Sequence, residues 1–310
     1  MLKNILLFLI CSGLVVGSNT NAAIIGGTDY EDGLQVADSP FIRSHGNTNI
    51  IVQAENGVTP RSGSWMQRTY LNRLTSTVMT YRSESQVIVP YSKTQWGSKI
   101  LNFDKGKEYW LGISIFIPAN WDMNYVNGYS GGIIFQFHDK GFNDPKNCGS
   151  DGASFCWRHT LPLTLMHQET GFVLRNHGWY NGYNPGNYKY FEVTTPYKLG
   201  QWTDFVANFK FSGNISKDDN NGFIRVWADG KLIYEREGQN FFGEQPEGAY
   251  FQYGIYNWGW REQYRTNWVG PDERLLYHDE VRFGDANSSY DEVAPPKSVV
   301  FKPNPPTGLK

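Results

Sequence analysis

The chain has 310 residues and a formal net charge of −2, and 40% of its residues are hydrophobic. This is the composition of an ordinary globular protein, and the nearly balanced charge excludes a general electrostatic affinity for nucleic acid or an anionic membrane. Aromatic residues make up 16% of the chain and there are 33 glycines, which together favour a sheet-rich fold with glycine turns.

The N-terminus has the pattern of a cleavable secretory signal. Lys3 supplies a positive charge, residues 5–16 are apolar but too few to span a bilayer, and Ala22 and Ala23 offer a small-residue cleavage site. The sequence therefore predicts a signal peptide over residues 1–22 and a secreted or periplasmic protein.

From about residue 65 the chain consists of short apolar or alternating runs separated by turn residues. Pro118 ends one run, as expected for a strand, and Asp229-Gly230 between two runs predicts a tight hairpin. A long helical period is absent from the sequence. The predicted strands cover residues 78–84, 108–117, 132–138, 161–167, 172–177, 202–211, 222–227, 231–234, 250–257 and 275–283.

Strands at this spacing, without intervening helices, predict one antiparallel β-sandwich domain over residues 23–293. The Gly- and Asn-rich stretch up to about residue 63 is expected to form loops and short strands along the edge of the domain. Five prolines among the last 17 residues predict an extended Pro-rich tail over residues 294–310.

Cys148 and Cys156 are the cysteines that remain after removal of the signal peptide. An even number in an exported protein favours a disulfide, with two free thiols as the alternative. Two cysteines outside a CxxC pattern make a poor metal site.

Alternating polar residues in three predicted strands point to a functional face, because residues two apart share one face of a sheet. Within 132–138, Gln136 and His138 share a face, and Ile134 shares it at the less polar end.

The other two strands repeat this pattern. Arg82 and Glu84 share one face, and Tyr250, Gln252 and Tyr256 share another. A sheet surface with Arg, Gln, His and Tyr is neither a good core nor an ordinary solvent face. The pattern predicts a groove for a polar, anionic ligand.

Three motifs in this order resemble the jelly-roll polysaccharide lyases of the alginate-lyase type. They are Arg82-Ser83-Glu84, Gln136-Phe137-His138 and Tyr-Phe-Gln-Tyr-Gly-Ile-Tyr-Asn over residues 250–257. The segments 226–231 and 276–284 are more similar to relatives that act on glucuronan and heparin. The resemblance spans roughly residues 65–290 and implies an all-β, concanavalin-like β-jelly roll with a concave substrate groove.

Two positions depart from the pattern of these lyases. Gln252 stands where they have a lysine, and Gln86 stands where a second arginine often follows the first motif. Both changes lower the positive charge of the expected groove, which bears on substrate contacts more than on the reaction itself.

The residue types suit β-elimination from a uronate, which removes the C5 proton and expels the C4 oxygen. The C6 carboxylate must be neutralised, a task for Gln136 and Arg82. His138 is the candidate base, since imidazole titrates near neutral pH, and Tyr256 is the candidate acid, which could also serve as the base. The resemblance implies the same roles. Candidate substrate-binding residues are Glu84, Arg175, His177, Tyr250, Gln252, Asn257 and Arg261.

Two other functions stay open. A glycoside hydrolase on the same sandwich needs two carboxylates that flank the bond. Asp279 and Glu280 are adjacent in their strand, so we expect them on opposite faces. A non-catalytic, lectin-like carbohydrate-binding module would use the aromatic residues, but it has no need of Gln, His, Tyr and Arg on one face.

The expected partner is an anionic uronate polysaccharide, cleaved within the chain. We favour β-1,4-glucuronan, with alginate or a heparin-like glycan as alternatives, because a densely sulfated chain would need more Lys and Arg. No cofactor or catalytic metal is expected, although a structural Ca²⁺ stays open. The protein is expected to be a monomer with no nucleic-acid or membrane partner.

Overall fold

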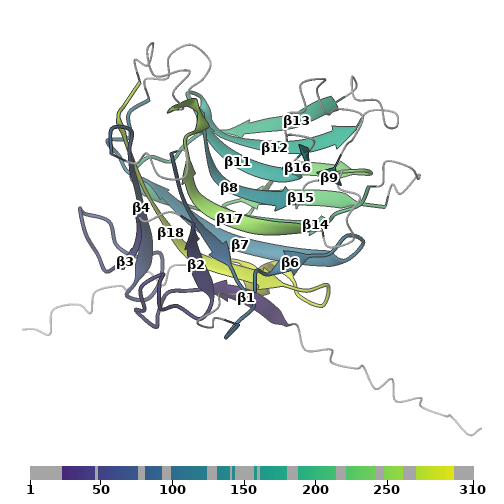
Figure 1. Ribbon diagram of the computed structural model, residues 1–310, viewed down its shortest axis with the longest axis horizontal. Helices are drawn as coiled ribbons and strands as arrows, with labels where there is room; N and C mark the ends of the chain where they lie inside the picture. Colours follow the sequence, from purple (N-terminus) through teal and green to yellow (C-terminus); the bar gives the residue numbers. More distant parts are fainter. Residues whose placement is uncertain are drawn as a thin grey trace, which may run out of the picture.

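The structure is a computed structural model in which two antiparallel sheets pack face to face as a β-sandwich of the jelly-roll type (Figure 1). It describes residues 23–45, 48–75, 81–92, 99–123, 131–139, 142–143, 157–158, 161–179, 188–213, 221–241, 248–260 and 270–296. For residues 45, 142–143, 157–158, 177–179 and 188–190 the description covers the backbone alone.

One sheet, here called the site sheet, has the strand order β13-β12-β11-β8-β17-β5-β2, with β6 paired to β17. Figure 1 shows β8, β11, β12, β13 and β17 as neighbouring, curved strands. The strands of this sheet are β2 (Ile42–His45), β5 (Arg82–Val87), β6 (Asn102–Phe103), β8 (Gly132–Asp139), β11 (Leu163–Gln168), β12 (Gly171–Trp179), β13 (Tyr188–Thr195) and β17 (Ala249–Tyr256).

The other sheet, the outer sheet, has the order β16-β15-β14-β7-β18-β4-β3, with β1 paired to β18. Its strands are β1 (Ile24–Thr28), β3 (Asn49–Val52), β4 (Met66–Asn72), β7 (Glu108–Ile117), β14 (Gln201–Lys210), β15 (Phe223–Ala228), β16 (Lys231–Glu237) and β18 (Glu273–Gly284). A separate pair, β9 (Phe142–Asn143) and β10 (Trp157–Arg158), and the short helices η3 (Trp258–Trp260) and α2 (Tyr290–Val293) complete the described elements.

The predicted β-sandwich is confirmed, and so is the hairpin between β15 and β16. Asp229 and Gly230 both have positive φ angles, 48° and 81°, as a tight two-residue hairpin turn requires. The prediction omitted β4 and β13, both of which alternate polar and apolar residues without a continuous apolar run.

Phenylalanine rings from both sheets form the centre of the core. Phe103, Phe137, Phe209, Phe251 and Phe283 make ring contacts with centroids 4.6 to 6.3 Å apart. They come from β6, β8, β14, β17 and β18. Because Phe137 points into this cluster, its neighbours Gln136 and His138 in β8 must point out of the core.

A bulge in the pairing of β8 overturns the expected face of Ile134. Tyr253 pairs with Phe135, but Tyr256 pairs with Ile133, so the register shifts between them. Ile134 consequently packs in the core between the sheets, and Ile133 takes the outward face beside Tyr256. An inserted residue reverses the alternation of a strand, which the sequence pattern alone does not reveal.

A second bulge corrects the expectation for Asp279 and Glu280. The register of β18 on β7 shifts between Asp279 and Arg282, and Glu280 has a φ of 55°. Both carboxylates therefore contact the same segment of the chain, residues 61–62. Asp279 accepts the backbone N–H of Arg61 at 2.8 Å, and Glu280 accepts the hydroxyl of Ser62.

Buried hydrogen bonds between the sheets hold β5 in place. Ser83 donates to Asn49 at 2.9 Å, Asn49 donates to Ser85 at 3.1 Å, and Ser85 donates to Gln67 at 2.7 Å. Asn49 and Gln67 belong to β3 and β4 of the outer sheet. Since satisfied polar networks in a core specify one arrangement, these bonds define which residues of β5 face outward.

Several predictions concern residues outside this description. The signal peptide, Cys148 and Cys156, and the tail beyond residue 296 all lie outside the described ranges. Within those ranges, no helix is long and apolar enough to cross a membrane.

The buried imidazole of His278 generates a prediction about stability. The side chain is 0% exposed, and within the described ranges neither ring nitrogen has a hydrogen-bond partner. Burial lowers the pKa of His278 from 6.5 to about 3. Below pH 6.5 the unfolded chain binds a proton that the folded protein does not, so this site reduces stability as the pH falls towards 3.

We expect His278→Leu to remove this loss. The free energy of unfolding of the variant, minus that of the wild type, should grow on acidification by up to about 1.4 kcal/mol per pH unit. Urea denaturation at several pH values measures it. His167, whose pKa burial also lowers, is present in both proteins and cancels. A difference that is constant with pH would contradict the prediction.

Candidate active site

Cross-strand pairing aligns one polar residue from each of seven strands of the site sheet. These residues alternate with core residues along their strands, so they face away from the outer sheet. Their register is continuous from β13 to β2. This set, here called the polar row, consists of Glu192, Arg175, Thr164, Gln136, Gln252, Gln86 and Arg43.

The side chain of Glu84 on β5 reaches across β17 to Gln136 in the polar row. Glu84 is 0% exposed and pairs in the ladder with Gly254 of β17, which lies between β5 and β8. Its carboxylate nevertheless accepts a hydrogen bond of 2.6 Å from the amide nitrogen of Gln136 on β8. Gly254 has no side chain, so the Glu84 side chain can pass over β17.

The backbone makes glycine necessary at position 254. Its φ is +145°, and a Cβ there would lie 2.1 Å from the carbonyl oxygen of Ser83. Both features exclude other residues. The glycine of the third motif is therefore explained by the close approach of β5 and by the path of Glu84.

Arg82 links Glu84 to Tyr256. Its Nε is 3.1 Å from a carboxylate oxygen of Glu84, and its guanidinium carbon lies 4.0 Å from the centre of the Tyr256 ring. Burial raises the pKa of Glu84, while the charge of Arg82 and the hydrogen bond from Gln136 act in the opposite direction. A positive charge thus lies directly over the phenol ring.

Tyr256 stands at an apolar end of the same face. It packs with Ile133, Met166 and Val173, and these four residues are here called the apolar end. The bulge in β8 produces this surface, because it turns Ile133 outward. The Tyr256 ring is only 8% exposed, so its environment contains little water.

His138 lies at the opposite end of the face. It pairs with Tyr250, and the two rings stack with centroids 5.3 Å apart. Its Nδ1 is 2.6 Å from the carbonyl oxygen of Asp139. A carbonyl only accepts, so Nδ1 carries a proton, and in the neutral imidazole Nε2 is then the acceptor nitrogen.

The register separates His138 from Tyr256. Tyr256 pairs with Ile133, five residues before His138 in β8. At the usual rise per residue of a strand, this corresponds to about 17 Å between the backbone positions. The stacking on Tyr250 and the contact with Arg82 hold the two rings at their separate ends.

The other predicted residues have different positions. Arg175 is in the polar row, where it pairs with Glu192 at 2.5 Å. Asn257 is buried, and its side-chain oxygen accepts a hydrogen bond of 2.9 Å from Nε2 of His167. The side chain of His177 and all of Arg261 lie outside the described residues.

The sequence analysis missed residues that the register adds to this face. Thr164 lies between Arg175 and Gln136 in the polar row, and Arg43 lies opposite Gln86. The backbone of His45 in β2 pairs with that of Glu84, and the His45 side chain lies outside the description. The alternation of Arg43 and His45 was the available signal, in a segment expected to contain loops and short strands.

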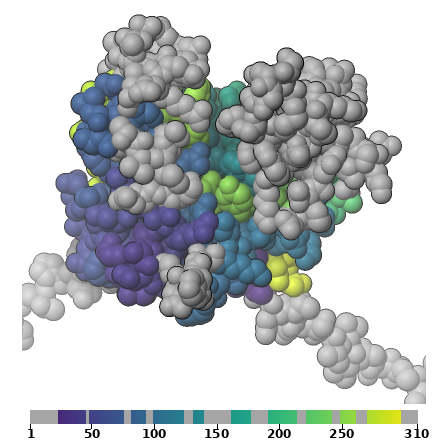
Figure 2. Space-filling model, in the orientation of Figure 1, coloured from purple at the N-terminus to yellow at the C-terminus, as the bar shows by residue number. Residues whose placement is uncertain are grey.

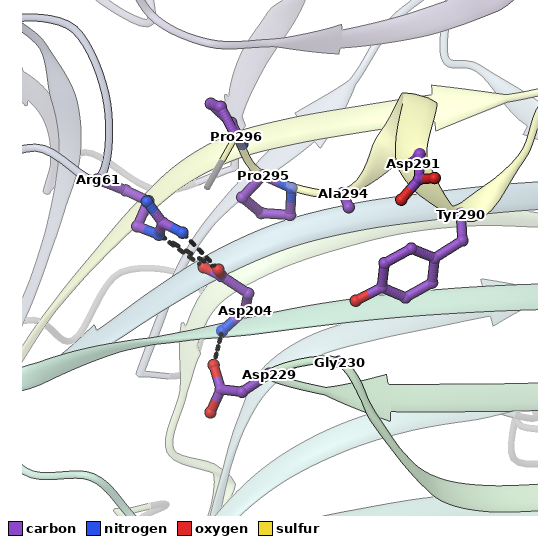
Figure 3. A pocket seen from close by; sticks show the side chains of 9 residues that line it. All are labelled: Arg61, Asp204, Asp229, Gly230, Tyr290, Asp291, Ala294, Pro295 and Pro296. Carbon is purple, nitrogen blue, oxygen red and sulfur yellow. Dashed lines mark hydrogen bonds and ion pairs between the residues drawn. The ribbon is translucent and has the colours of Figure 1, made fainter. Parts of the chain in front are cut away.

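A hollow on the outer sheet does not form a second site of this kind. In Figure 3, Arg61 points at Asp204, with nitrogen–oxygen distances of 2.9 and 2.7 Å. Asp229 accepts the backbone N–H of Asp204 and pairs with Lys198 at 2.6 Å. These carboxylates are already bound within the protein. The hollow, of about 300 Å³, is lined by Arg61, Asp204, Asp229, Gly230, Tyr290, Asp291, Ala294, Pro295 and Pro296.

In Figure 2 the green atoms of β17 are visible in a hollow near the centre of the drawn face. Among the residues that the structure describes, no three His, Cys, Asp or Glu side chains gather as a metal ion would need.

Known proteins are similar to this chain over most of its length. The family model described as polysaccharide lyase matches residues 43–282. The chain is similar in structure to an endo-β-1,4-glucuronan lyase from the fungus Trichoderma reesei, with 18% identity and a TM-score of 0.56, over 85% of this chain and 97% of that one. At this identity the likeness shows a shared fold.

Two further solved structures are more distant. Alginate lyase Aly36B is 12% identical, with a TM-score of 0.44 over 86% of this chain and 93% of its own. An alginate lyase from Chlorella virus is 11% identical, with a TM-score of 0.44 over 76% and 88%. A comparison with curated proteins finds no match.

The contact between Asn257 and His167 gives a prediction. Asn257→Ala leaves the buried N–H of His167 without its acceptor, so the free energy of unfolding should fall by about 1–3 kcal/mol. Urea denaturation measures the change. Asn120→Ala, at an exposed position, is the matched control and should have little effect. If both variants were equally stable, Asn257 would not hold β17 in this way.

Proposed function

This chain belongs to the polysaccharide lyase family, whose model matches it from residue 43 to residue 282, and we propose that it cleaves a β-1,4-linked polyglucuronate within the chain. It is an enzyme, a polysaccharide lyase. The choice of glucuronan rests on the fungal endo-β-1,4-glucuronan lyase, which shares the fold over most of both chains. Alginate and heparin-like glycans are the alternative substrates.

The reaction is the β-elimination of the C4 substituent of a uronate. A base removes the C5 proton, the electrons of that bond form the C4–C5 double bond, and the bond from C4 to the bridging oxygen breaks. An acid protonates the leaving oxygen. Negative charge develops next to the C6 carboxylate during proton removal, so positive charge and hydrogen-bond donors must surround it.

The arrangement of Arg82 over Tyr256 is the observation that carries the proposal. The guanidinium lies 4.0 Å from the ring centre, where it stabilises negative charge on the phenolic oxygen. We assign to Tyr256 both proton transfers: its phenolate takes the C5 proton, and the resulting phenol returns a proton to the leaving oxygen. Arg82 is positioned to bind the C6 carboxylate.

One residue can perform both transfers only if the proton and the leaving oxygen lie on the same side of the ring. They do so in D-glucuronate and D-mannuronate, and they lie on opposite sides in L-guluronate. The assignment therefore favours D-configured uronates. It agrees with the choice of glucuronan and disfavours guluronate-rich alginate.

His138 then has a different task from the one first expected. About 17 Å of strand separates it from the partner of Tyr256, so it is poorly placed to act on the same bond. With its ring stacked on Tyr250 at the far end of the face, it is suited to contact a neighbouring sugar. We assign it to substrate binding.

The two rival functions have weaker support. A hydrolase could use Asp279 and Glu280, which the bulge in β18 brings to one segment. However, they lie beneath Arg61 and Ser62 and not on the face of the site sheet that carries Tyr256. The match to the polysaccharide lyase family disfavours a non-catalytic carbohydrate-binding module, which the activity test also separates from a lyase.

We propose further that the protein is exported by residues 1–22 and acts as a monomer without a cofactor. These statements rest on the sequence patterns described above. The amide and guanidinium groups of the site are suited to the charge neutralisation for which other enzymes use a metal.

The main test follows the ultraviolet absorbance of the unsaturated uronate during incubation with polyglucuronate. The wild type should form this product, and Tyr256→Phe should reduce kcat by about 10³-fold or more, since it removes the acid–base group. His138→Ala should raise KM and leave kcat within a few-fold of the wild type.

Other outcomes would redirect or end the proposal. Binding of polyuronates without unsaturated product would indicate a carbohydrate-binding module, and a saturated reducing end would indicate hydrolysis. A loss of kcat in His138→Ala or His45→Ala, with Tyr256→Phe still active, would make a histidine the base.

A second prediction concerns Glu84. Glu84→Ala should release both Arg82 and Gln136 from their positions and lower kcat by about 10²-fold. Glu84→Gln should lose less, because its amide oxygen can still accept the hydrogen bond from Gln136. Glu235→Ala removes a carboxylate from an ion pair with Arg225 on the outer sheet and is the control, with kcat close to wild type. Equal effects of Glu84→Ala and Glu235→Ala would refute the positioning role.

A further inference from the structure

Two buried polar groups at the centre of the polar row have no partner within the described part of the chain. They are the amide nitrogen of Gln252 and the hydroxyl of Thr164. Each residue is 1% exposed. In the ladder they stand on either side of Gln136, Thr164 on β11 and Gln252 on β17.

The orientation of the Gln252 amide is defined by its neighbour. Its Oε1 lies 3.5 Å from Nε2 of Gln136, so the oxygen end is turned towards β8 and the NH₂ group is turned away. The Gln136 nitrogen itself donates to Glu84 at 2.6 Å. Among the described residues, the amide nitrogen of Gln136 is therefore engaged and that of Gln252 is not.

Unpaired buried polar groups are costly, so native proteins contain few of them. Thr164 has Leu163 and Leu165 as strand neighbours, both in the core, and a valine would fit its position without an unsatisfied hydroxyl. Two such groups, on one face and on either side of a predicted site residue, indicate that a ligand completes their hydrogen bonds.

We infer that Gln252 and Thr164 bind one uronate ring of the substrate, and that this neutral subsite selects a polyuronate without sulfate groups. The inference rests on the proposed function and makes its substrate class more specific. The NH₂ group of Gln252 donates to the carboxylate of the ring. The Thr164 hydroxyl, which both donates and accepts, binds a ring hydroxyl.

The spacing of the two groups suits a single sugar. Thr164 and Gln252 are two strands apart, which places their backbones about 10 Å from one another. A pyranose ring with its exocyclic groups fits between side chains at that spacing. Gln136, between them, forms the floor beneath the ring.

The charges around this subsite support a weakly charged substrate. Arg82 is 3.1 Å from Glu84, and Arg175 is 2.5 Å from Glu192, so each arginine of these pairs has a carboxylate beside it. Gln252 adds hydrogen-bond donors but no charge. A chain with sulfate groups as well as carboxylates would meet too little positive charge here.

The test measures binding separately from catalysis. Tyr256→Phe serves as the parent, and isothermal titration calorimetry gives its Kd for β-1,4-linked oligoglucuronates of defined length. Adding Gln252→Met or Thr164→Val, which keep the side-chain shape, should weaken binding by about tenfold or more. Gln201→Met, at an exposed position of β14, is the control and should leave Kd unchanged.

A stability measurement distinguishes a ligand-binding role from a structural one. Because Gln252→Met and Thr164→Val remove buried groups without partners, their urea midpoints should equal or exceed that of the parent. Lower midpoints would show that the protein uses these groups in its own structure, which would overturn the inference. Unchanged Kd values, or no measurable binding by the parent, would also overturn it.

Substrate class is tested with the same proteins. The parent should bind oligoglucuronates more tightly than heparin fragments of equal length, and Gln252→Lys should reduce that preference. Equal binding of both glycans by the parent would refute the neutral subsite. If these results appear but the wild type forms no unsaturated product, the proposed reaction fails and the subsite stands.

Discussion

The site depends on one carboxylate held out of water between two strands. Glu84 has no exposed surface, and it is linked to Gln136 on one side and to Arg82 on the other. Such a charge is tolerated only where donors and a counter-charge surround it. Gly254 follows from this requirement, since a side chain there would block the path over β17. Arg82 and Gln136 both contact the Glu84 carboxylate. These contacts place Arg82 over the Tyr256 ring and Gln136 beneath the subsite.

The pairing of charges within the face explains how a protein of nearly balanced charge can act on an anionic polymer. Its arginines are accompanied by carboxylates or amides, as in Arg82 with Glu84 and Arg43 with Gln86, whose hydrogen bond is 2.6 Å. Attraction over long range is therefore weak, and recognition relies on short contacts with defined geometry. The replacement of a lysine by Gln252 and of an arginine by Gln86, noted from the sequence, is consistent with this design.

Much of the face could be predicted from the sequence, because side chains alternate with a period of two in a regular strand. This rule places Arg82 with Glu84 and Gln136 with His138 correctly. It fails at Ile134 and Glu280, where bulges insert a residue and reverse the alternation. The rule also cannot predict which residues of different strands lie side by side. Thr164 and Arg43 join the polar row through the register, which depends on contacts between strands distant in sequence. The separation of His138 from Tyr256 is a property of that register as well.

The bulge that turns Ile133 outward creates a gradient of polarity along a single strand pair. At one end, Tyr256 is packed among Ile133, Met166 and Val173, and at the other His138 and Tyr250 carry polar edges. Coulomb interactions strengthen as the local dielectric constant falls, so a given charge acts more strongly on the phenol than on the imidazole. The bulge in β8 thereby divides one continuous surface into a dry end suited to breaking a bond and a wetter end suited to holding the polymer.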